Sequence, residues 1–311
     1  FVECCNYMRK YNFKLKATFM AAIFSACLNC AAKNSAADCS FIAIADAQYS
    51  SNAETKMNRH YKLSIQKLDK ILESEKSGQF DFVVNLGDAI DGGFSNYKHV
   101  VSRLEAFPFP LYNLLGNHDL ACSENEQLEA VKLLFKGGKT YYSMDKGGWK
   151  FIFLDPMRLS GVSKIKPLEC KRQYEEIFSK LSEENAVNAK PWNGGIDSEQ
   201  LEWLESQIKK AQFEKKKAIV FCHMPIFPLN SESLYNWREV SGLMSKYDCV
   251  KAYIAGHYHK GGYACADGIH YITVCGLVEG EKVSYARVYL YGDSIRVSGV
   301  GDVKSLDLSI R

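Results

Sequence analysis

Residue types that bind metal ions follow five short apolar segments of this 311-residue chain. Carboxylates, carboxamides and imidazoles recur there, and each group begins directly after an apolar run. Such oxygen and nitrogen ligands suit divalent cations, which polarise phosphoryl oxygens and lower the pKa of bound water. We therefore predict a site for metal chemistry. The five groups are Asp46 with Gln48, Asp88 with Asp91, Asn117 with His118 and Asp119, His223, and His257 with His259.

Each of these groups has an ordinary structural explanation when it is taken alone. A single histidine after a strand is commonly a hydrogen-bonded structural residue, and a Gly-Asp pair is commonly a turn. Asp46 is suited to cap a helix, and Asn117 is suited to a left-handed turn. Five such groups in a row, each at the end of an apolar run, have no common structural explanation. We therefore interpret the set as one site.

The apolar runs themselves predict the strands that position this site. Runs of this length, rich in β-branched and aromatic residues, are typical of strands buried on both faces. In open α/β sheets, binding sites lie at the carboxyl ends of the strands. A glycine precedes Asp88, Asn117 and His257, and we expect these glycines to allow sharp turns. The predicted strands are residues 41–45, 82–86, 111–115, 218–222 and 250–254.

Helical patterns lie between these strands and complete an α/β arrangement. Apolar residues spaced three and four apart predict helices within residues 61–73 and 198–211. Asp197 and Gln200 together resemble a capping box for the second helix. Strands that alternate with helices in this way indicate an α/β fold.

The last third of the chain changes to short β-like runs at residues 271–274, 283–291 and 295–300. Residues 140–154 also indicate a hairpin that turns at residues 146–148. We therefore expect two sheets packed together between helices. No repeat or low-complexity linker divides the chain, so we predict one catalytic domain at residues 38–311.

Composition and charge argue against several classes of partner. The chain is 47% apolar and 24% charged, with a net charge of only +3. Its basic residues are scattered, and short basic stretches such as residues 215–217 suit a helix end. These features disfavour a nuclease or a binder of nucleic acid or membrane surfaces. We expect a monomeric protein with a small-molecule partner.

Residues 1–37 differ from the rest of the chain. Four basic residues between positions 9 and 16 precede the apolar run 17–27, which is too short to span a bilayer. This order predicts an export signal. Residues 24–27 resemble a bacterial lipoprotein cleavage box, with Cys27 as a lipid anchor and the only expected membrane attachment. We expect a periplasmic or membrane-anchored protein. The alternative is an N-terminal segment that stays attached to a cytoplasmic protein.

The ordered motifs resemble those of the calcineurin-like metallophosphoesterase superfamily. They stand at residues 46–48, 87–91, 116–119, 223 and 256–259. The resemblance implies a four-layer αββα sandwich with a centre of two divalent metal ions. It also implies the ligands. One ion would bind Asp46, Gln48, Asp88 and His259, and Asp88 would bridge to a second ion completed by Asn117, His223 and His257.

Gln48 bears on the identity of the metal, because many members of the superfamily have His at this position. An amide oxygen is a harder ligand than imidazole, and the carboxylates of Asp46 and Asp88 are hard ligands too. Such ligands favour Mn²⁺ or Mg²⁺ over Zn²⁺. We expect Mn²⁺, with Mg²⁺, Fe or Zn²⁺ as alternatives.

Four further segments resemble the manganese-dependent ADP-ribose/CDP-alcohol diphosphatases. These segments are residues 45–49, 192–196, 200–204 and 255–263. The resemblance implies hydrolysis of the pyrophosphate bond of nucleoside diphosphate derivatives, such as ADP-ribose and CDP-alcohols, by a metal-bridging hydroxide. The alternative is a phosphodiesterase or phosphomonoesterase of the same superfamily, because the strand-end ligands bind only the phosphoryl group. A non-catalytic scaffold should have lost ligands, and none is missing.

The motifs also indicate residues for proton transfer and substrate binding. His118 is the candidate to protonate the leaving oxygen, and Asp119 either orients its ring or forms a turn or helix cap. Asp91 is expected to steady a ligand. For the aromatic and loop candidates at the substrate, the alternative is a core side chain or an ordinary turn. The candidate substrate contacts are Tyr49, Asn117, Asn193 and Tyr263.

Overall fold

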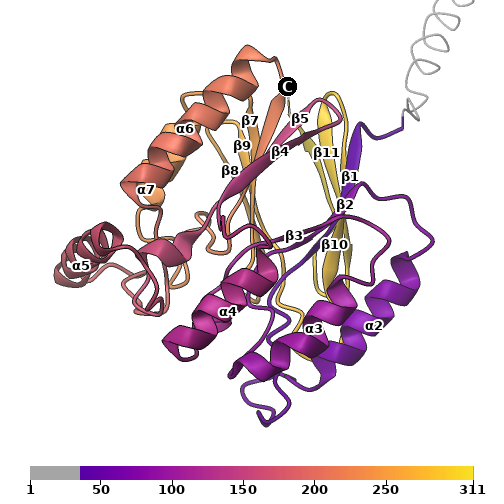
Figure 1. Ribbon diagram of the computed structural model, residues 1–311. Coiled ribbons are helices and arrows are strands. Elements are labelled where there is room, and N and C mark those ends of the chain that lie inside the picture. Colours follow the sequence, from indigo (N-terminus) through magenta and orange to yellow (C-terminus); the bar gives the residue numbers. More distant parts are fainter. Residues whose placement is uncertain (1–35, 311) are drawn as a thin grey trace, which may run out of the picture. The chain divides into compact units, whose positions relative to one another are not determined.

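The computed structural model describes residues 36–310, and one of its two sheets is built around the first strand (Figure 1). β1 runs parallel to β2 on one side and antiparallel to β10 on the other. The order of the sheet is β12-β11-β10-β1-β2-β3. Its strands are β1 (Cys39–Ile44), β2 (Phe82–Asn85), β3 (Leu111–Asn113), β10 (Tyr285–Leu290), β11 (Ser294–Val300) and β12 (Leu306–Ser309).

The second sheet has the order β4-β5-β6-β7-β9-β8 and faces the first. Its four central strands are parallel, and β4 and β8 pair antiparallel at the edges. The predicted hairpin joins β4 to β5, and it turns at Gly147 and Gly148, both with positive φ as a two-residue turn requires. The strands are β4 (Tyr142–Lys146), β5 (Trp149–Phe153), β6 (Lys217–Phe221), β7 (Val250–Ala255), β8 (Gly262–Ala266) and β9 (Ile269–Thr273).

Helices cover the outer faces of both sheets (Figure 1). α2, α3 and α4 lie against the first sheet, α6 and α7 lie against the second, and α5 lies farther out. The protein is therefore the four-layer αββα sandwich that the sequence predicts. The helices are α2 (Leu63–Glu75), α3 (Tyr97–Leu104), α4 (Glu124–Leu134), α5 (Leu168–Glu183), α6 (Ser198–Phe213) and α7 (Trp237–Met244).

The central strands are buried on both faces, and their side chains alternate between two cores. Along β1, Phe41 points between the two sheets, whereas Ile42 and Ile44 belong to the core under the helices. Phe41 stacks on Phe82 with ring centroids 4.7 Å apart, and Phe221 of the other sheet meets Phe41 edge-on at 5.5 Å. Burial of each such side chain contributes about 1.5–3 kcal/mol. This packing fixes the strand ends that carry the site.

The start of α6 differs from the expected capping box. The Asp197 carboxylate accepts the backbone N–H of Gln200 at 3.2 Å, so the helix cap is present. The Gln200 side chain does not return to Asp197. It is buried and bonds to the backbone N–H and C=O of Asp155 instead. Gln200 therefore fastens α6 to the end of β5.

The expected leader at residues 1–37 lies almost wholly outside the described residues, as does the lipid anchor predicted at Cys27. Within residues 36–310, every helix is too short or too polar to cross a membrane.

Candidate metal centre

The predicted ligands meet where parallel strands from both sheets end. Asp46 and Gln48 follow β1, Asp88 follows β2, and the other candidates follow β3, β6 and β7. Asp46, Asp88, His223 and His257 each offer one ligand atom, and these four atoms lie within 4.8 Å of one another. All four side chains are buried. The fold thus brings together residues that are up to 211 positions apart in the sequence.

His259 and Gln48 extend this cluster. His259 Nε2 lies 3.4 Å from Asp46 Oδ1, and the Gln48 amide nitrogen is 3.1 Å from both His259 Nε2 and Asp88 Oδ2. A half-turn of the amide exchanges its nitrogen and oxygen and gives the oxygen this central place. Asn117 lines the adjoining cavity. The structure therefore groups all seven predicted ligands around the same strand ends.

Each of the three histidines is held at one ring nitrogen and presents the other to the centre. Metal-binding histidines in proteins are commonly oriented in this way by an acceptor at the second nitrogen. The distances are short enough to fix each ring. The acceptors are Leu86 O for His223 Nδ1 (2.7 Å), Asn193 Oδ1 for His257 Nε2 (2.9 Å) and Glu279 Oε1 for His259 Nδ1 (2.8 Å).

Buried polar atoms without a hydrogen-bond partner mark the same place. Five side-chain N or O atoms of the described residues are buried and unpartnered, and three of them belong to predicted ligands: Gln48 Oε1, Asn117 Oδ1 and His223 Nε2. Burial of an unpartnered polar atom is unfavourable. A cation at the centre would give these atoms a partner, so the residues present fit a metal site.

Backbone strain also concentrates at the ligands. Asp46, Gln48, Asp88 and His257 have φ angles of 51°, 40°, 55° and 62°, in the left-handed region that non-glycine residues rarely adopt. Such conformations cost about 1–3 kcal/mol each and persist where the surrounding structure enforces them. Strain at four of the seven predicted ligands indicates that these backbone conformations lower stability but direct the side chains toward the metal centre.

The glycines before the ligands have two different roles. Gly87 has a φ of 98°, as the expected sharp turn requires. Gly116 and Gly256 have no positive φ, and here the requirement is space. A Cβ on Gly116 would lie 2.1 Å from Asp88 Oδ1, and one on Gly256 would lie 2.7 Å from Asp46 Oδ2. These two glycines let the backbone approach the carboxylates.

Charge is compensated within the cluster. Burial lowers the pKa of a histidine, but the charge of Asp88 overcomes this effect and raises the pKa of His223 to about 9. Asp46 likewise raises the pKa of His259 to about 9 against the effect of burial. Burial raises the pKa of Asp88, yet the charge of His223 holds it below its usual range. Buried carboxylates require nearby positive charge, which divalent cations supply more strongly.

The ring of His118 is oriented by Asp91 and not by Asp119. His118 Nδ1 lies 3.0 Å from Asp91 Oδ1. The Asp119 carboxylate instead accepts the backbone N–H groups of Asp88, Ala89 and Gly116 at 2.8–2.9 Å. This corrects the expectation that Asp119 orients the ring, and it favours the alternative of a residue that stabilises a turn. Asp119 therefore shapes the loop that carries Asp88.

A comparison with known families decides the identity of this site. A model of the calcineurin-like phosphoesterase family matches residues 40–261, a range that contains the five strand ends and all seven predicted ligands. The chain belongs to this family.

Individual relatives agree with this assignment. A protein of Arabidopsis thaliana named manganese-dependent ADP-ribose/CDP-alcohol diphosphatase is 29% identical to this phosphoesterase over 298 residues, which cover 86% of this chain and 96% of the relative. The protein of the same name from Mus musculus is 27% identical over 312 residues, covering 85% and 91%.

Solved structures share the fold. A dimetal phosphatase from Danio rerio superposes with a TM-score of 0.78 at 23% identity, and the match covers 88% of this chain and 100% of that one. A Plasmodium protein described as GAP50, the anchor in the inner membrane complex, superposes with a TM-score of 0.55 at 16% identity, covering 88% and 89%. Both similarities show the αββα sandwich alone.

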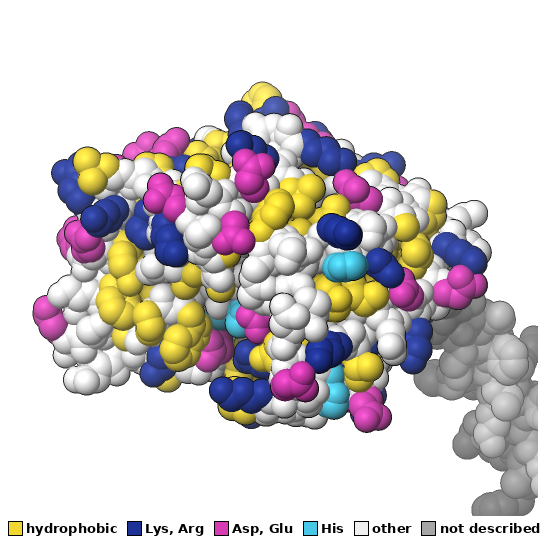
Figure 2. All heavy atoms as spheres, turned by 60° about the horizontal axis from the view of Figure 1, so that its bottom comes forward, with side chains coloured by type: hydrophobic (Ala, Val, Ile, Leu, Met, Phe, Trp, Pro, Cys, Tyr) yellow, Lys and Arg dark blue, Asp and Glu magenta, His cyan; other side chains and the backbone are white. Residues whose placement is uncertain are grey.

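A cavity of about 880 Å³ opens beside the metal-facing residues of the phosphoesterase. Of the predicted ligands, Gln48, Asn117, His257 and His259 line it, and so does His118. The face of the molecule drawn in Figure 2 mixes acidic, basic and histidine side chains, without a broad area of one charge. The volume of the cavity is typical of a small-molecule site.

Three of the four predicted substrate contacts lie elsewhere. Tyr49 and Tyr263 are absent from the lining of the cavity. The Tyr49 ring packs edge-on against His99, and the Tyr263 hydroxyl bonds to His270 Nδ1. Asn117 does line the cavity. Both tyrosines therefore lie outside the lining of this cavity, each engaged with a neighbouring histidine, and their contact with the substrate stays a prediction.

Asn193 has a different function from the expected one. Its side chain is fully buried, and its Nδ2 donates to backbone carbonyls of residues 188, 231 and 233. Its Oδ1 lies 2.9 Å from His257 Nε2. Asn193 therefore holds a ligand in place, which corrects its assignment as a substrate contact.

Sequence reasoning missed two carboxylates of the site. Glu279 bonds to His259 and lies 3.6 Å from the Arg59 guanidinium. Glu232 accepts the indole N–H of Trp192 at 2.7 Å and lies 3.2 Å from His257 Nε2. Neither belongs to a motif, and the only signal for Glu279 is its place shortly after the run 271–274.

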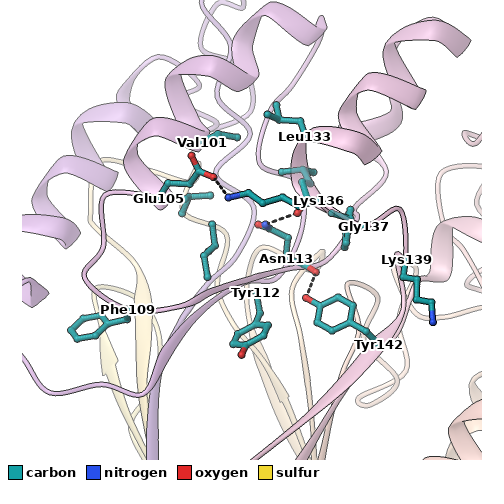
Figure 3. A pocket seen from close by; sticks show the side chains of 14 residues that line it. Val101, Glu105, Phe109, Tyr112, Asn113, Leu133, Lys136, Gly137, Lys139 and Tyr142 are labelled. Carbon is teal, nitrogen blue, oxygen red and sulfur yellow. Dashed lines mark hydrogen bonds and ion pairs between the residues drawn. The ribbon is translucent and has the colours of Figure 1, made fainter.

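A second cavity, of about 580 Å³, lies between the ends of α3 and α4 and the edge strands β3 and β4 (Figure 3). The Tyr142 hydroxyl donates to Asn113 O at 2.9 Å beside it, and Lys136 pairs with Glu105 at 2.9 Å. None of the predicted site residues lines this cavity. The chemistry of the phosphoesterase therefore belongs to the cavity beside the strand ends.

Proposed function

We propose that the protein hydrolyses the pyrophosphate bond of nucleoside diphosphate derivatives, such as ADP-ribose and CDP-alcohols, with two divalent cations of which Mn²⁺ is preferred. The observation that carries this proposal is the meeting of seven ligand-type side chains at five strand ends, beside a cavity of about 880 Å³. The names of the Arabidopsis and mouse relatives support the same substrate class and the same metal.

The donor set favours hard cations. Four of the seven side chains offer oxygen, and three offer imidazole nitrogen, a mixture that suits Mn²⁺. When bound, two such cations would polarise phosphoryl oxygens and lower the pKa of a bound water. The residues that would hold them are Asp46, Gln48, Asp88, Asn117, His223, His257 and His259.

His118 delivers the proton to the leaving group. Its side chain lines the cavity next to Asn117, and Asp91 holds Nδ1. This hydrogen bond leaves Nε2 available to carry a proton toward a substrate oxygen, which is the geometry that a general acid requires. Asp91 is therefore a positioning residue for His118.

The rest of the cavity provides what a nucleotide needs. Arg59 and Lys260 line it and supply positive charge for a second phosphoryl group. Trp192 lines it with an indole that is 41% exposed and is held by Glu232. An exposed aromatic wall with a few polar partners is typical of nucleotide sites. These side chains support a nucleoside diphosphate over a simple phosphomonoester.

The proposal is tested by assaying purified protein in Mn²⁺ against ADP-ribose, CDP-choline, a cyclic nucleotide and bis(p-nitrophenyl) phosphate. We expect the highest kcat/KM for the first two compounds, with a nucleoside monophosphate as one product. A preference for the cyclic nucleotide or the generic diester would reject the diphosphatase assignment and favour the phosphodiesterase alternative.

The Asp88→Asn variant and a chelated sample serve as controls for the metal requirement. Asp88 is expected to contact both cations, so the variant should lose all turnover, and chelation should abolish activity until Mn²⁺ is restored. Full activity in either sample would reject a two-metal centre.

A further inference from the structure

Lys67 is a buried cation that pairs with no carboxylate of the described residues. It lies on α2 and is only 2% exposed. Its ammonium group donates to the backbone oxygens of Leu277, Glu279 and Gly280 at 2.5, 3.0 and 2.9 Å. Burial lowers the pKa of Lys67 to about 8. An apolar residue would complete the buried face of α2 without this desolvation penalty, so folding of the helix does not explain a lysine here.

The carbonyl groups that Lys67 binds belong to a segment, residues 276–280, that contacts one part of the metal centre. The segment runs beside the end of β1, where its Val278 N–H donates to Asp46 O at 3.0 Å. Its Gly276 N–H donates to His259 O at 3.0 Å, and the Glu279 carboxylate accepts from the His259 ring at 2.8 Å. The segment therefore supports both Asp46 and His259.

These two residues belong to the same predicted metal ion. The family resemblance assigns Asp46 and His259 to one cation, together with Gln48 and the bridging Asp88. The second cation would bind Asn117, His223 and His257, whose hydrogen-bond partners in the described residues lie outside residues 276–280. A displacement of the segment would thus disturb one cation and spare the other.

Lys67 supplies the donors for three backbone oxygens of the segment, which is also held by backbone bonds to residues 58–60 and to the end of β1. No other hydrogen-bond donor of the described residues reaches the backbone oxygens of Leu277, Glu279 and Gly280. Without the ammonium group, the buried carbonyl of Leu277 would be left unpaired, which is unfavourable, and the partly buried carbonyls of Glu279 and Gly280 would have to turn to water. The segment would then move toward water and carry Glu279 away from His259.

We propose that Lys67 is a positioning residue for one of the two metal ions, because its ammonium group holds residues 276–280 where Asp46 and His259 need them. The inference rests on the proposed function, since it assumes a centre of two cations.

The test compares Mn²⁺ binding by wild-type protein and the Lys67→Met variant, which keeps the length of the side chain and removes its donors. Calorimetric titration, with free Mn²⁺ followed by electron paramagnetic resonance, measures the two affinities separately. We expect two bound ions in the wild type. In the variant, one affinity should fall by about 10- to 100-fold, the usual effect of losing a group that orients a ligand, and the other should stay unchanged.

Lys150 provides a matched control. It is also 2% exposed, lies on β5, and pairs with Asp145 at 2.9 Å, away from residues 276–280. Lys150→Met should lower the thermal midpoint and leave both Mn²⁺ affinities unchanged. The milder Lys67→Gln variant keeps an amide donor and should weaken the same ion less than Lys67→Met. If Lys67→Met fails to fold, the Mn²⁺ affinities of Lys67→Gln provide the test instead.

A double-mutant cycle separates positioning from a general loss of stability. Glu279→Gln should weaken the same Mn²⁺ ion as Lys67→Met, and the double variant should weaken it less than the sum of the two effects, because both act through His259. Unchanged affinities in Lys67→Met, an equal fall of both, or the same pattern in Lys150→Met would overturn the inference alone. Failure of the wild type to bind two Mn²⁺ ions would overturn the proposed function with it.

Discussion

The second nitrogen of each histidine decides how its ring can be used. His223 is held by a neutral backbone carbonyl, His257 by an amide oxygen with the Glu232 carboxylate 3.2 Å away, and His259 by a carboxylate. A carboxylate acceptor increases the basicity of the ring more than a neutral one does. The same physical rule applies to His118, whose ring is held by Asp91 at 3.0 Å. Substitution of Asp91 therefore tests the role of His118, because Asp91 is not among the predicted metal ligands.

Asp91→Asn should lower kcat by roughly 10- to 100-fold, a part of what a positioned general acid contributes. The amide is a weaker acceptor than the carboxylate, so the ring of His118 loses its orientation. The Mn²⁺ affinities should remain unchanged, because the Asp91 carboxylate bonds to His118 and to no predicted ligand. Steady-state kinetics and a Mn²⁺ titration on the same preparation check both expectations.

Asp119→Asn is the matched comparison. The Asp119 carboxylate accepts the backbone N–H groups of Asp88, Ala89 and Gly116 with its two oxygens. A side-chain amide has only one oxygen, and its nitrogen cannot accept, so the amide cannot replace all of these bonds. Asp119→Asn should therefore reduce stability and Mn²⁺ binding together. Equal Mn²⁺ affinity in this variant, or a loss of Mn²⁺ binding in Asp91→Asn, would contradict the assigned roles.

At the scale of single residues, the sequence predicts the metal ligands better than it predicts the residues that hold them in place. The seven ligands follow strand ends directly, so motif and position agree on each of them. Asp91 and Asp119 both belong to motifs, but the 3-10 turn His118–Leu120 folds Asp119 back under Asp88 and leaves the ring to Asp91. Which carboxylate reaches the ring depends on this turn and cannot be found from spacing.

A buried carboxylate links α2 to β10 by an electrostatic contact. Glu75 ends α2, is 3% exposed, and accepts hydrogen bonds from Tyr285 and from Arg287, whose Nε lies 3.0 Å away. β10 is the antiparallel neighbour of β1. Glu75 therefore ties the helix to the strand that flanks the first ligand strand.

Stability should depend on this contact in a pH-dependent way. Burial raises the pKa of Glu75, but the hydrogen bonds and charge of Arg287 outweigh it and hold the pKa below the usual 4.5. Between the two pKa values the unfolded chain binds more protons than the folded one. The stabilisation is thus complete above pH 4.5 and is lost as the pH falls through the folded-state pKa.

Glu75→Gln should lower the free energy of unfolding by about 1.5–3 kcal/mol at pH 7, the range for hydrogen bonds to a charged group. The difference between variant and wild type should shrink as the pH falls below 4.5. Urea unfolding at pH 7 and at several acidic values measures it. A difference that stays constant with pH would show that Glu75 acts through packing alone.

Among the elements, burial decided what the sequence could predict. The five ligand strands are apolar on both faces and stand out as runs. α5 carries apolar residues spaced three and four apart at positions 170, 174, 177, 178 and 181, so it could have been predicted from the same pattern, although only Cys170 and Leu181 are buried. β8 has no fully buried residue, and as an edge strand it gives no such run. The edge strand β8 therefore escapes detection because none of its residues is fully buried.

The predicted metal ligands come from both sheets of the sandwich. Asp46, Gln48, Asp88 and Asn117 follow strands of the first sheet, and His223, His257 and His259 follow strands of the second. Cations bound by both sets would link the two sheets. The global stability of the protein should therefore depend on Mn²⁺.

The thermal midpoint should rise with Mn²⁺ concentration and fall on chelation. A ligand that binds only the folded state adds about 2.7 kcal/mol per site when its free concentration is a hundred times its Kd. Differential scanning calorimetry across a Mn²⁺ series measures the shift. Asp88→Asn should abolish most of it, and a midpoint independent of Mn²⁺ in the wild type would contradict a centre shared by the two sheets.

At the scale of the molecule, the two-sheet architecture could be predicted, but the strand order could not. Apolar runs and motifs indicate an αββα sandwich. Nothing local indicates that β1 lies between β2 and β10, because the register that pairs Cys39 with Leu290 joins residues far apart in the chain. Such pairing follows from global packing, which a single sequence does not display.

The position of β1 affects how the chain folds while it is being synthesised. A nascent chain carries every predicted ligand once His259 has been added, yet β10 is added only at residues 285–290. Until then the strand that aims Asp46 and Gln48 has an open edge, which is a site for pairing with the wrong partner. The last three strands contribute no predicted ligand. They must nevertheless be synthesised before β10 can pair with β1 and hold Asp46 and Gln48 in their final positions.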